Sequence, residues 1–534
     1  MSRTPDVSVI VAVYNTMPYV TRCVESVLSQ TIGADRLELI AVDDGSTDGG
    51  GEELDRFARE HPDTVTVVHQ ENSGGPAAPS NVALGLAQGR YVFFLGSDDH
   101  LGPEALERMV AVADDNECDV VLGKMIGEGG RRAPKAAFEE PGLDVPFPLS
   151  KAVWALSNTK LFRREPIERH GLRFMEDVAV YSDVPFTIEA MALARRIATL
   201  TDYEYYYTVE RDNAANVTYS SKLSERLHAT RRIVETVTRL YGPGEERDAL
   251  LYRVFAYEQW ILLQEGLLDL DEEGRRGICD GVAELADAHL TDAMRAKLPV
   301  EKRVRFAYAQ RRDLDGLRAA IEFEGPPRFV AEGERAFARY PGFRASGGPA
   351  DESYELIGDT VLGRIANGTE PVSTAWTGEG GGPCLELVFR VPVSGLAEAD
   401  LSVGAVRLKQ GKRPRKRRSV PAEERLAPQV EAEVALTPDG EATVVRARLR
   451  LRELEAAARP SRWSLRWYLR LADRRYDLPL RAPRSQPSAL RGRRRSAVER
   501  DDRDRIIVRL HRRGPRAALK RCLRRLGLPV GGRG

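Results

Sequence analysis

The chain has 534 residues, of which 42% are hydrophobic and 30% are charged, and its formal net charge at pH 7 is zero. These proportions are typical of globular proteins and argue against a wholly disordered chain. Because single hydrophobic cores stop growing at about 250–300 residues, we expect about three domains.

The N-terminal segment has an apolar run from Val7 to Val13 without a signal-peptide cleavage pattern. This run and every other uninterrupted apolar stretch are far shorter than the roughly 20 residues that a transmembrane helix needs. The five cysteines are scattered and include no CxxC pair, which favours reduced thiols. We therefore expect a cytoplasmic protein.

Short β-branched segments alternate with helical patterns from residue 7 to about 125. The expected strands are VSVIVAVY, LELIAVDD, VTVVHQ and RYVFFLGSDD, and the expected helices lie over 19–30, near 52–60 and near 80–88. This alternation predicts a parallel, doubly wound α/β sheet, in which ligands bind beyond the carboxyl ends of the strands. Polar residues that follow these strands should converge on one rim: Asn15, Asp43, Asp44, Asn72, Asp98 and Asp99.

The pattern changes three times further along the chain. A mixed segment up to residue 221 completes the predicted α/β domain, and helical periodicity over 222–325 predicts a small helical subdomain for packing or spacing. Alternating segments such as CLELVFRVPV and SRWSLRWYLRL predict an antiparallel β-sandwich over 350–482.

A basic tail over 483–534 ends the chain. Residues 481–534 contain 18 Arg and Lys against 4 Asp and Glu, so the rest of the chain is acidic. We expect 412–419 to form an exposed basic loop, 484–505 to be disordered, and the segment from Ile506 to form a broken amphipathic helix on anionic lipid. Such a tail would give the protein a peripheral place at the inner face of the plasma membrane.

Six segments occur in an order that has a known counterpart: VSVIVAVYN, VDDGSTDG, ENSGGPAAPSN, GRYVFFLGSDD, SNTKLFRRE and YSDVPF. Over about residues 6–220 they resemble family 2 glycosyltransferases. The resemblance implies a GT-A fold, a Rossmann-like α/β domain that binds a nucleotide-diphosphate sugar. The fold class expected for the whole chain is this α/β domain followed by a helical subdomain and a β-sandwich domain.

The resemblance also implies a binding site for the donor. Tyr14 would lie against the base and Asp44 would accept its imide N–H, which favours a UDP-sugar. The implied donor-binding residues are Val13, Tyr14, Asn15, Asp44, Ser46, Asn72, Asp98 and Arg211.

Asp98 and Asp99 correspond to the family's acidic motif, which implies Mg²⁺ or Mn²⁺, hard cations that take oxygen ligands. Two positions depart from the usual pattern. Gly96 stands where many relatives have a first aspartate, and Ser80 stands where relatives usually have an arginine. The diphosphate contact of that arginine would then come from Arg211.

Asp183, in the YSDVPF segment, matches the family's general base, which deprotonates the acceptor hydroxyl during an inverting displacement. Glu176 and Asp177 are nearby rivals for this role. Without the resemblance, Asp44 reads as an ordinary turn residue, and Asp98 and Asp99 read equally well as a helix cap. Trp154 and the tyrosines of YEYYY read as core more readily than as a sugar platform.

A looser similarity links the whole chain to bacterial wall teichoic acid glycosyltransferases, through SGGPxxP, the helical segment and the β-sandwich. It implies transfer of a sugar to an anionic cell-envelope polymer, which would be attracted to the basic segments, and a possible homo-oligomer. Two alternatives remain: a transferase that builds exopolysaccharide or capsule on a lipid-linked glycan, and an inactive binding scaffold. No motif indicates specific binding of nucleic acid.

Overall fold

The computed structural model describes residues 4–211, 221–324, 327–332, 335–357, 365, 368–378, 383–396, 401–408, 430–457, 461–471, 474–480, 489–491, 496–500 and 506–510. Contacts divide the chain into two compact units, one of residues 1–295 with 309–314 and one of residues 296–308 with 315–534.

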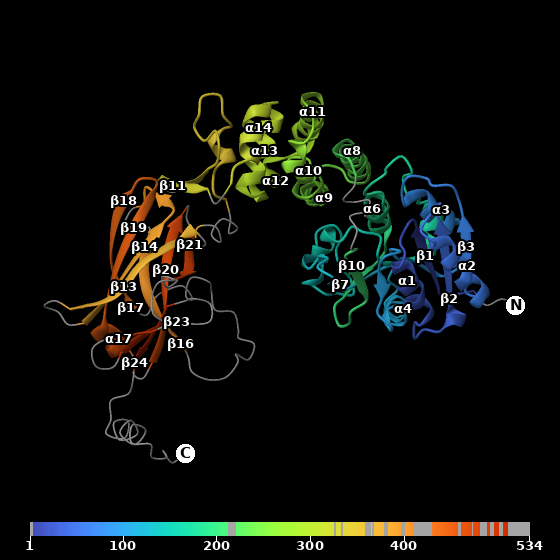
Figure 1. The fold of residues 1–534 in the computed structure, drawn as a ribbon, viewed down its shortest axis with the longest axis horizontal. Helices are drawn as coiled ribbons and strands as arrows, with labels where there is room; N and C mark the ends of the chain where they lie inside the picture. The colour runs from blue at the N-terminus through green and yellow to red at the C-terminus, as the bar shows by residue number, and fades with distance from the viewer. Residues whose placement is uncertain are drawn as a thin grey trace, which may run out of the picture. The chain divides into compact units, whose positions relative to one another are not determined.

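The first unit is built around a seven-stranded sheet, of which Figure 1 labels β1, β2 and β3. The order of its strands is β3-β2-β1-β4-β8-β6-β9. Its strands are β1 (Val7–Val13), β2 (Leu37–Asp43), β3 (Val65–His69), β4 (Tyr91–Phe94), β6 (Val120–Gly123), β8 (Leu161–Arg163) and β9 (Ile197–Leu200). Parallel pairing joins β3, β2, β1 and β4, which confirms the expected α/β sheet. The exception is β8, which runs antiparallel to both β4 and β6, so the sheet is mixed. Because Leu161 pairs with Phe93, the start of β8 lies beside the carboxyl end of β4.

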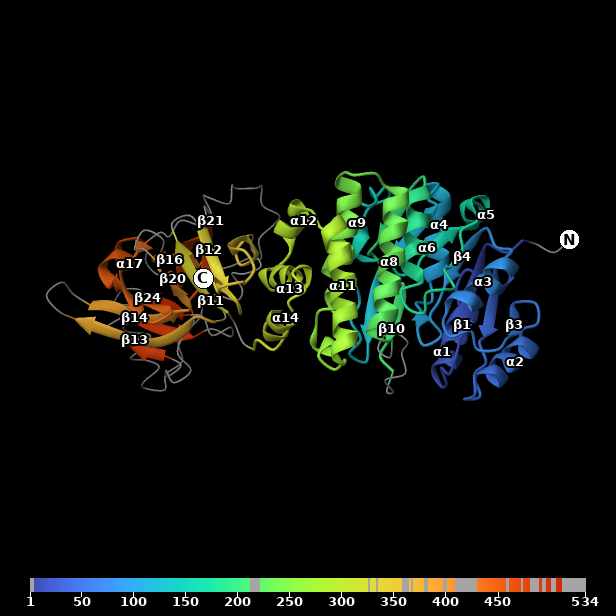
Figure 2. The same ribbon diagram turned by 90° about the horizontal axis from the view of Figure 1, so that it is seen from above.

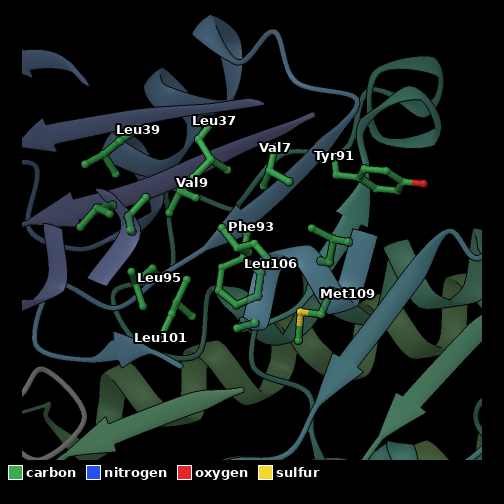
Figure 3. Packing of buried hydrophobic residues seen from close by; sticks show 14 of the residues in the cluster. Val7, Val9, Leu37, Leu39, Tyr91, Phe93, Leu95, Leu101, Leu106 and Met109 are labelled. Atoms are coloured by element: carbon green, nitrogen blue, oxygen red, sulfur yellow. The ribbon is translucent and has the colours of Figure 1, made fainter. Parts of the chain in front are cut away.

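Helices cover both faces of this sheet, because the side chains of its central strands alternate between two apolar cores. The helices are α1 (Tyr19–Leu28), α2 (Gly50–Glu60), α3 (Ala77–Leu86), α4 (Ala105–Asp115), α5 (Arg164–His170) and α6 (Asp183–Leu193). Val7 and Val9 belong to the core shared with α1, α2 and α4, in which Phe93 lies near Leu106 (Figure 3). Ile10 faces the other core, shared with α3, α5 and α6. Burial of each large apolar side chain contributes about 1.5–3 kcal/mol, so the sheet provides a rigid support for the loops at its rim.

A small second sheet, β5-β10-β7, borders the carboxyl end of β4. It consists of β5 (His100–Leu101), β7 (Met125–Glu128) and β10 (Tyr206–Val209). Its middle strand, β10, brings Tyr206 to the loop that follows β4.

Seven α-helices lie within the described residues 221–324, in agreement with the expected helical subdomain. They are α8 (Leu223–Leu240), α9 (Glu245–Ala256), α10 (Glu258–Ile261), α11 (Glu272–His289), α12 (Asp292–Lys297), α13 (Val300–Gln310) and α14 (Leu314–Ile321). Within the first unit, α8 packs against α6, α9 and α11 (Figure 2). Among the described residues, every helix is too short or too polar to cross a lipid bilayer.

The second unit is rich in antiparallel strands, as expected. One sheet contains β13 (Glu370–Gly378), β14 (Pro383–Val391), β18 (Glu433–Asp439) and β19 (Ala442–Arg450), and the other contains β16 (Leu401–Leu408), β17 (Val430–Glu431), β20 (Ser461–Leu471), β21 (Arg474–Pro479), β22 (Ala489–Arg491), β23 (Ser496–Arg500) and β24 (Ile506–Leu510). A third, small sheet contains β11 (Arg328–Glu332), β12 (Arg335–Arg339) and β15 (Val393–Ser394), and helix α17 covers Leu451–Ala457. Phe389 of β14 and Trp467 of β20 meet with ring centroids 5.7 Å apart, so the inner faces of the two larger sheets share a core.

The tail differs from the expectation. The helix expected from Ile506 is wrong over Ile506–Leu510, which form β24 between β20 and β23. Three consecutive β-branched residues, Ile506, Ile507 and Val508, are buried there, which suits a strand better than one face of a helix. The disorder expected over 484–505 is likewise wrong for β22 and β23. The basic loop 412–419 and residues 511–534 lie outside the described residues.

Candidate functional site

The rim of the sheet begins with the turn after β1. Asn15 has a φ of 50°, a left-handed conformation that asparagine tolerates better than most residues. Its backbone N–H donates to Ser46 Oγ at 3.1 Å, and its Oδ1 accepts from the N–H of Thr47 at 2.8 Å. These bonds tie the turn after β1 to the turn after β2 and leave the side chain of Tyr14, which is 46% exposed, at the surface.

Asp44 follows β2 and is buried in the same rim. Its backbone N–H donates to the carbonyl of Val13 at 2.8 Å. Its carboxylate accepts from Gln70 Nε2 at 2.6 Å and from the N–H and hydroxyl of Ser73. The N–H of Ser73 lies 3.1 Å from both carboxylate oxygens, so each oxygen accepts two contacts. Asp44 is therefore held in place before any ligand binds.

Two further predicted rim residues shape the loops. Asp43 Oδ1 accepts from the N–H of Ser46 at 2.9 Å, and Asn72 Oδ1 accepts from the N–H of Gly74 at 2.8 Å. Gly45 has a φ of +78°, and a Cβ there would lie 3.0 Å from the backbone nitrogen of Asn72. A glycine is needed because the turns after β2 and β3 approach so closely.

Asp98 and Arg211 form an ion pair beyond β4. Arg211 Nε lies 2.7 Å from Asp98 Oδ2, and both side chains are nearly buried. The sequence placed both residues at the donor site, and the structure brings them into contact. Ser80 is buried within α3, so this position supplies no cation to the rim.

Asp99 is held by β10. Its Oδ2 accepts from the hydroxyl of Tyr206 at 2.5 Å, and its Oδ1 accepts from the N–H of Val209 at 2.8 Å. Burial raises the pKa of Asp99 above its usual range, and the charge of Asp98 adds to this effect. Tyr206 is 1% exposed, so its interpretation as a core residue is confirmed. Its hydroxyl contact with the acidic pair was not foreseen, because the period-two pattern of YEYYY shows burial and no partner.

The contact between Asp99 and Tyr206 explains why residue 96 is a glycine. A Cβ at this position would lie 2.8 Å from Asp99 Oδ2 and 3.1 Å from the hydroxyl of Tyr206. A larger residue at position 96 would therefore push Asp99 away from Tyr206. The glycine in place of a first aspartate is part of how this chain packs its acidic pair.

A divalent cation fits this site through one carboxylate. Among the residues that the structure describes, no cluster of three or more His, Cys, Asp or Glu side chains could enclose a metal ion. Sites that bind Mg²⁺ with a nucleotide need only one or two carboxylates, because phosphate oxygens and waters complete the octahedron. Asp98 Oδ1 accepts no hydrogen bond from the described residues, whereas both oxygens of Asp99 do.

Asp183 begins helix α6. It interacts with Asn158 in the turn before β8, and this turn lies beside the carboxyl end of β4, so Asp183 belongs to the same rim. The backbone N–H groups of Asn158 and of Asp183 itself favour the ionised form of this carboxylate, which lowers its pKa. Burial raises the pKa of Asp183 to about 6, while the nearby cation Lys160 and these N–H groups oppose the rise. A carboxylate with a pKa close to the working pH is suited to accept a proton.

The two rivals of Asp183 are engaged in other contacts. Glu176 Oε1 accepts from Asn81 Nδ2 at 2.9 Å. Asp177 is about half exposed and pairs with Arg232 of α8 at 3.1 Å. Asp183 is only partly exposed, whereas Glu176 and Asp177 are exposed.

Helix α8 holds the loop that leads to Asp183. Val178 and Val180 pack on Ala229, and the hydroxyl of Tyr181 accepts from Arg226 Nη1 at 2.6 Å. The helical subdomain therefore does more than act as a spacer. The sequence did not reveal this contact, because helical periodicity identifies an apolar face without naming what it covers.

Tyr206→Phe should lower the free energy of unfolding by about 1–3 kcal/mol, because it leaves a buried carboxylate oxygen and the N–H of Gly96 without their partner. Thermal unfolding monitored by circular dichroism measures this loss. Tyr207→Phe is the matched control, since its hydroxyl bonds to the exposed Glu204, and it should cost less than about 0.5 kcal/mol. Equal losses in the two variants would contradict the burial argument.

A GT-A fold with these polar residues at the carboxyl ends of its strands defines a nucleotide-sugar glycosyltransferase domain. Residues 8–200 match the family model "Glycosyl transferase family 2", and residues 225–321 match "Glycosyl transferase TarS linker domain". The chain thus contains a family 2 glycosyltransferase domain followed by a TarS linker domain. Both resemblances noted from the sequence are confirmed.

Curated relatives match somewhat more than one third of the chain. Poly(ribitol-phosphate) beta-glucosyltransferase of Bacillus spizizenii is 36% identical over 206 residues, which cover 39% of this chain and 32% of the relative. Poly(ribitol-phosphate) beta-N-acetylglucosaminyltransferase TarS of Staphylococcus aureus is 35% identical over 205 residues, which cover 38% of this chain and 36% of the relative. The matched region thus spans about one third of the length of these relatives.

Solved structures extend the similarity. Residues 1–349 of S. aureus TarS in complex with UDP-GlcNAc share 27% identity and a TM-score of 0.55, covering 66% of this chain and all of that one. The larger S. aureus TarS structure shares 20% identity and a TM-score of 0.60, covering 95% of this chain and 85% of that one. At that identity the second match establishes the fold only, including the C-terminal sheets.

Proposed function

We propose that this protein is an inverting glycosyltransferase that moves a sugar from a UDP-sugar to a teichoic-acid-like polymer of polyol phosphate. The observation that carries this proposal is the gathering of Asp44, the Asp98–Arg211 pair and Asp183 at one rim of a GT-A sheet. The sequence relatives that act on poly(ribitol-phosphate) support the choice of acceptor. The solved complex of TarS with UDP-GlcNAc supports the choice of donor.

The donor would lie along the turns after β1, β2 and β4. Tyr14 offers an exposed ring to the base, and the carboxylate of Asp44 would accept the imide N–H of the base. Asp98 would hold Mg²⁺ or Mn²⁺, which supplies charge neutralisation for the departing diphosphate. Arg211, already at Asp98, provides a second positive group within reach of the phosphates.

Asp183 would act as the general base. In its ionised form it accepts the proton of the acceptor hydroxyl as that oxygen attacks the anomeric carbon from the face opposite the diphosphate. A single displacement of this kind inverts the configuration at the anomeric carbon. Helix α8 holds the loop before α6, and this loop fixes the carboxylate of Asp183 in position for the attack.

The acceptor would be a polyanion, and the Arg-rich C-terminal sequence suits such a partner through charge attraction. We place the enzyme in the cytoplasm, where a nucleotide sugar is available, with the basic tail as a contact to anionic membrane or polymer. We also propose that the protein self-associates through the β-sandwich. The proposed domains are 1–221, 222–325, 350–482 and 483–534.

A thermal-shift panel tests the donor. UDP, GDP, CDP and dTDP are each added with Mn²⁺ or with EDTA, and only UDP with Mn²⁺ should raise the melting temperature. Ligand at 100 times its Kd stabilises the native state by about 2.7 kcal/mol, a shift that the assay detects readily. Absence of any shift would favour the inactive scaffold.

A transfer assay tests the acceptor. UDP-GlcNAc and UDP-glucose are offered with poly(ribitol-phosphate), poly(glycerol-phosphate) or a lipid-linked glycan, and UDP release is measured. We expect release with a polyol phosphate polymer. Release with the lipid-linked glycan alone would instead support the exopolysaccharide function.

A further inference from the structure

A histidine closes the ladder between β2 and β3, at the end of the sheet where the donor turns lie. His69, the last residue of β3, pairs in register with Asp43, the last residue of β2. Its Nδ1 lies 3.0 Å from Asp43 Oδ2, and its Nε2 lies 2.9 Å from Asp55 Oδ1 of helix α2. The imidazole ring therefore joins the rim of the sheet to one of the helices that cover it.

These two contacts define the charge of the ring. An ionised carboxylate only accepts hydrogen bonds, and a neutral imidazole has a single N–H to donate. Asp43 faces the ring from β2 and Asp55 faces it from α2, the two elements packed against β3. Both contacts are therefore hydrogen bonds only when both ring nitrogens of His69 carry a proton. The hydrogen bonds to Asp55 and Asp43 accordingly raise the pKa of His69 above its usual value.

Asp43 links this contact to the donor turns. It is 5% exposed, and its other oxygen, Oδ1, accepts from the N–H of Ser46 at 2.9 Å. Ser46 Oγ in turn accepts from the N–H of Asn15 at 3.1 Å. Burial would raise the pKa of Asp43, but the hydrogen bonds from Ser46 and His69 outweigh burial and hold this pKa below its usual range. A chain of hydrogen bonds thus runs from His69 to the turn after β1.

The first turn of α2 lies against the same pair of side chains. A Cβ at Gly51 would lie 2.7 Å from Asp43 Oδ2 and 3.4 Å from His69 Cε1. The first of these distances is too short for a carbon–oxygen contact, so the helix can approach this closely only because residue 51 is a glycine. The packing of α2 on the end of β2 therefore depends on the carboxylate oxygen that His69 binds.

We propose that His69 is a positioning residue for the donor site, which in its doubly protonated form fixes Asp43 between α2 and Ser46 and thereby holds the turns that bind the nucleotide. The proposal rests on the proposed function, because the ligand that these turns bind is the UDP-sugar. His69 acts through Asp43 and touches no substrate in this scheme.

The direction of the pH effect follows from the loss of one proton. Below about pH 6.5, the ordinary pKa of histidine, the ring is protonated with or without its carboxylate partners, and both contacts are complete. As the pH rises through the raised pKa of His69, the ring keeps one N–H, and one carboxylate then faces an unprotonated nitrogen. The turns are held less firmly, so affinity for UDP should fall as the pH rises.

Isothermal titration of the full-length protein with UDP and Mg²⁺, at steps from about pH 6.5 to about pH 9, tests this. We expect the Kd of the wild type to rise by about twofold to fivefold over this range, the effect that a half-exposed ion pair supports. His69→Gln has no charge at any pH, so it should bind UDP at pH 6.5 as weakly as the wild type does at pH 9. His69→Lys keeps a positive charge, so its affinity should stay close to that of the wild type at pH 6.5 throughout.

Two further variants sharpen the test. His61→Gln is the matched control, because that histidine is exposed at the end of α2 and should follow the wild type. Asp55→Asn removes the partner that contributes most to the raised pKa of His69, so the fall in affinity should begin at lower pH. The ionisation of UDP is the same in every titration, so differences between the proteins report on the protein.

Transfer kinetics distinguish positioning from a general loss of structure. In His69→Gln at pH 6.5, KM for UDP-GlcNAc should rise by about twofold to fivefold while kcat changes by less than about twofold. Equal Kd values in the wild type and His69→Gln, or the pH dependence of the wild type retained in His69→Lys, would overturn the proposal. A wild type that binds no UDP would reject the proposed function, and the role of His69 with it.

Discussion

Asp183→Asn should reduce kcat for sugar transfer by about 10²–10⁴-fold, the usual contribution of a positioned general base. Asparagine has nearly the same shape and can still accept hydrogen bonds from the N–H groups of Asn158 and residue 183. The amide cannot take up the acceptor proton, so chemistry is lost while the loop is preserved. The measurement is UDP release from UDP-GlcNAc in the presence of poly(ribitol-phosphate).

UDP binding provides the internal check on this variant. In the proposed scheme UDP contacts the turns after β1 and β2 together with Asp98 and Arg211, and Asp183 contacts only the acceptor hydroxyl, so the thermal shift with UDP and Mn²⁺ should be retained. Asp177→Asn is the matched control, with the same chemical change six residues earlier in an exposed ion pair with Arg232. Loss of activity in Asp177→Asn with retention in Asp183→Asn would reverse the assignment of the base.

The sheet and its rim could be predicted because their signals are local. Val7, Val9 and the other apolar residues of β1 mark a strand buried on both faces, and the polar residues after each strand mark where the strands end. Parallel pairing then brings these ends together without further information. For this reason Asn15, Asp44 and Ser46 form the predicted rim.

Contacts between segments far apart in sequence were not predictable in this way. Tyr206 and Asp99 are 107 residues apart and meet only because β10 pairs with β5 and β7. Lys160 belongs to a segment identified by its resemblance, but its burial depends on the antiparallel strand β8. A lysine is normally exposed, so no sequence pattern indicated that this one is buried.

The prediction for the basic tail was wrong for the opposite reason. It gave more weight to the high arginine content than to the local pattern of apolar residues. The arginines of the tail suggested a surface helix on lipid, yet Ile506, Ile507 and Val508 alone provide enough β-branched apolar surface to complete a sheet. Charge counted over 54 residues carried no information about a five-residue strand.

Asp98→Asn should weaken metal-dependent binding of UDP by about 10–100-fold or more, since it removes the carboxylate proposed to hold the cation. The EDTA arm gives the sharper expectation. Without metal, the carboxylate of Asp98 repels the diphosphate and occupies Arg211. The amide carries no charge, so it does not repel the diphosphate and holds Arg211 less strongly, and UDP should bind Asp98→Asn as well as, or more tightly than, the wild type in EDTA.

Isothermal titration of UDP with Mn²⁺ and with EDTA separates the possible roles of Asp98. Asp202→Asn is the control, because that carboxylate lies on the surface beside Arg108 and should leave both titrations unchanged. An equal loss of affinity with and without metal would mean that Asp98 only supports Arg211 and the loop. Unchanged metal-dependent affinity would mean that the cation, if used, is held elsewhere. A loss confined to Mn²⁺ with a gain in EDTA is expected only if Asp98 exchanges its contact with Arg211 for a contact with the metal when the donor binds.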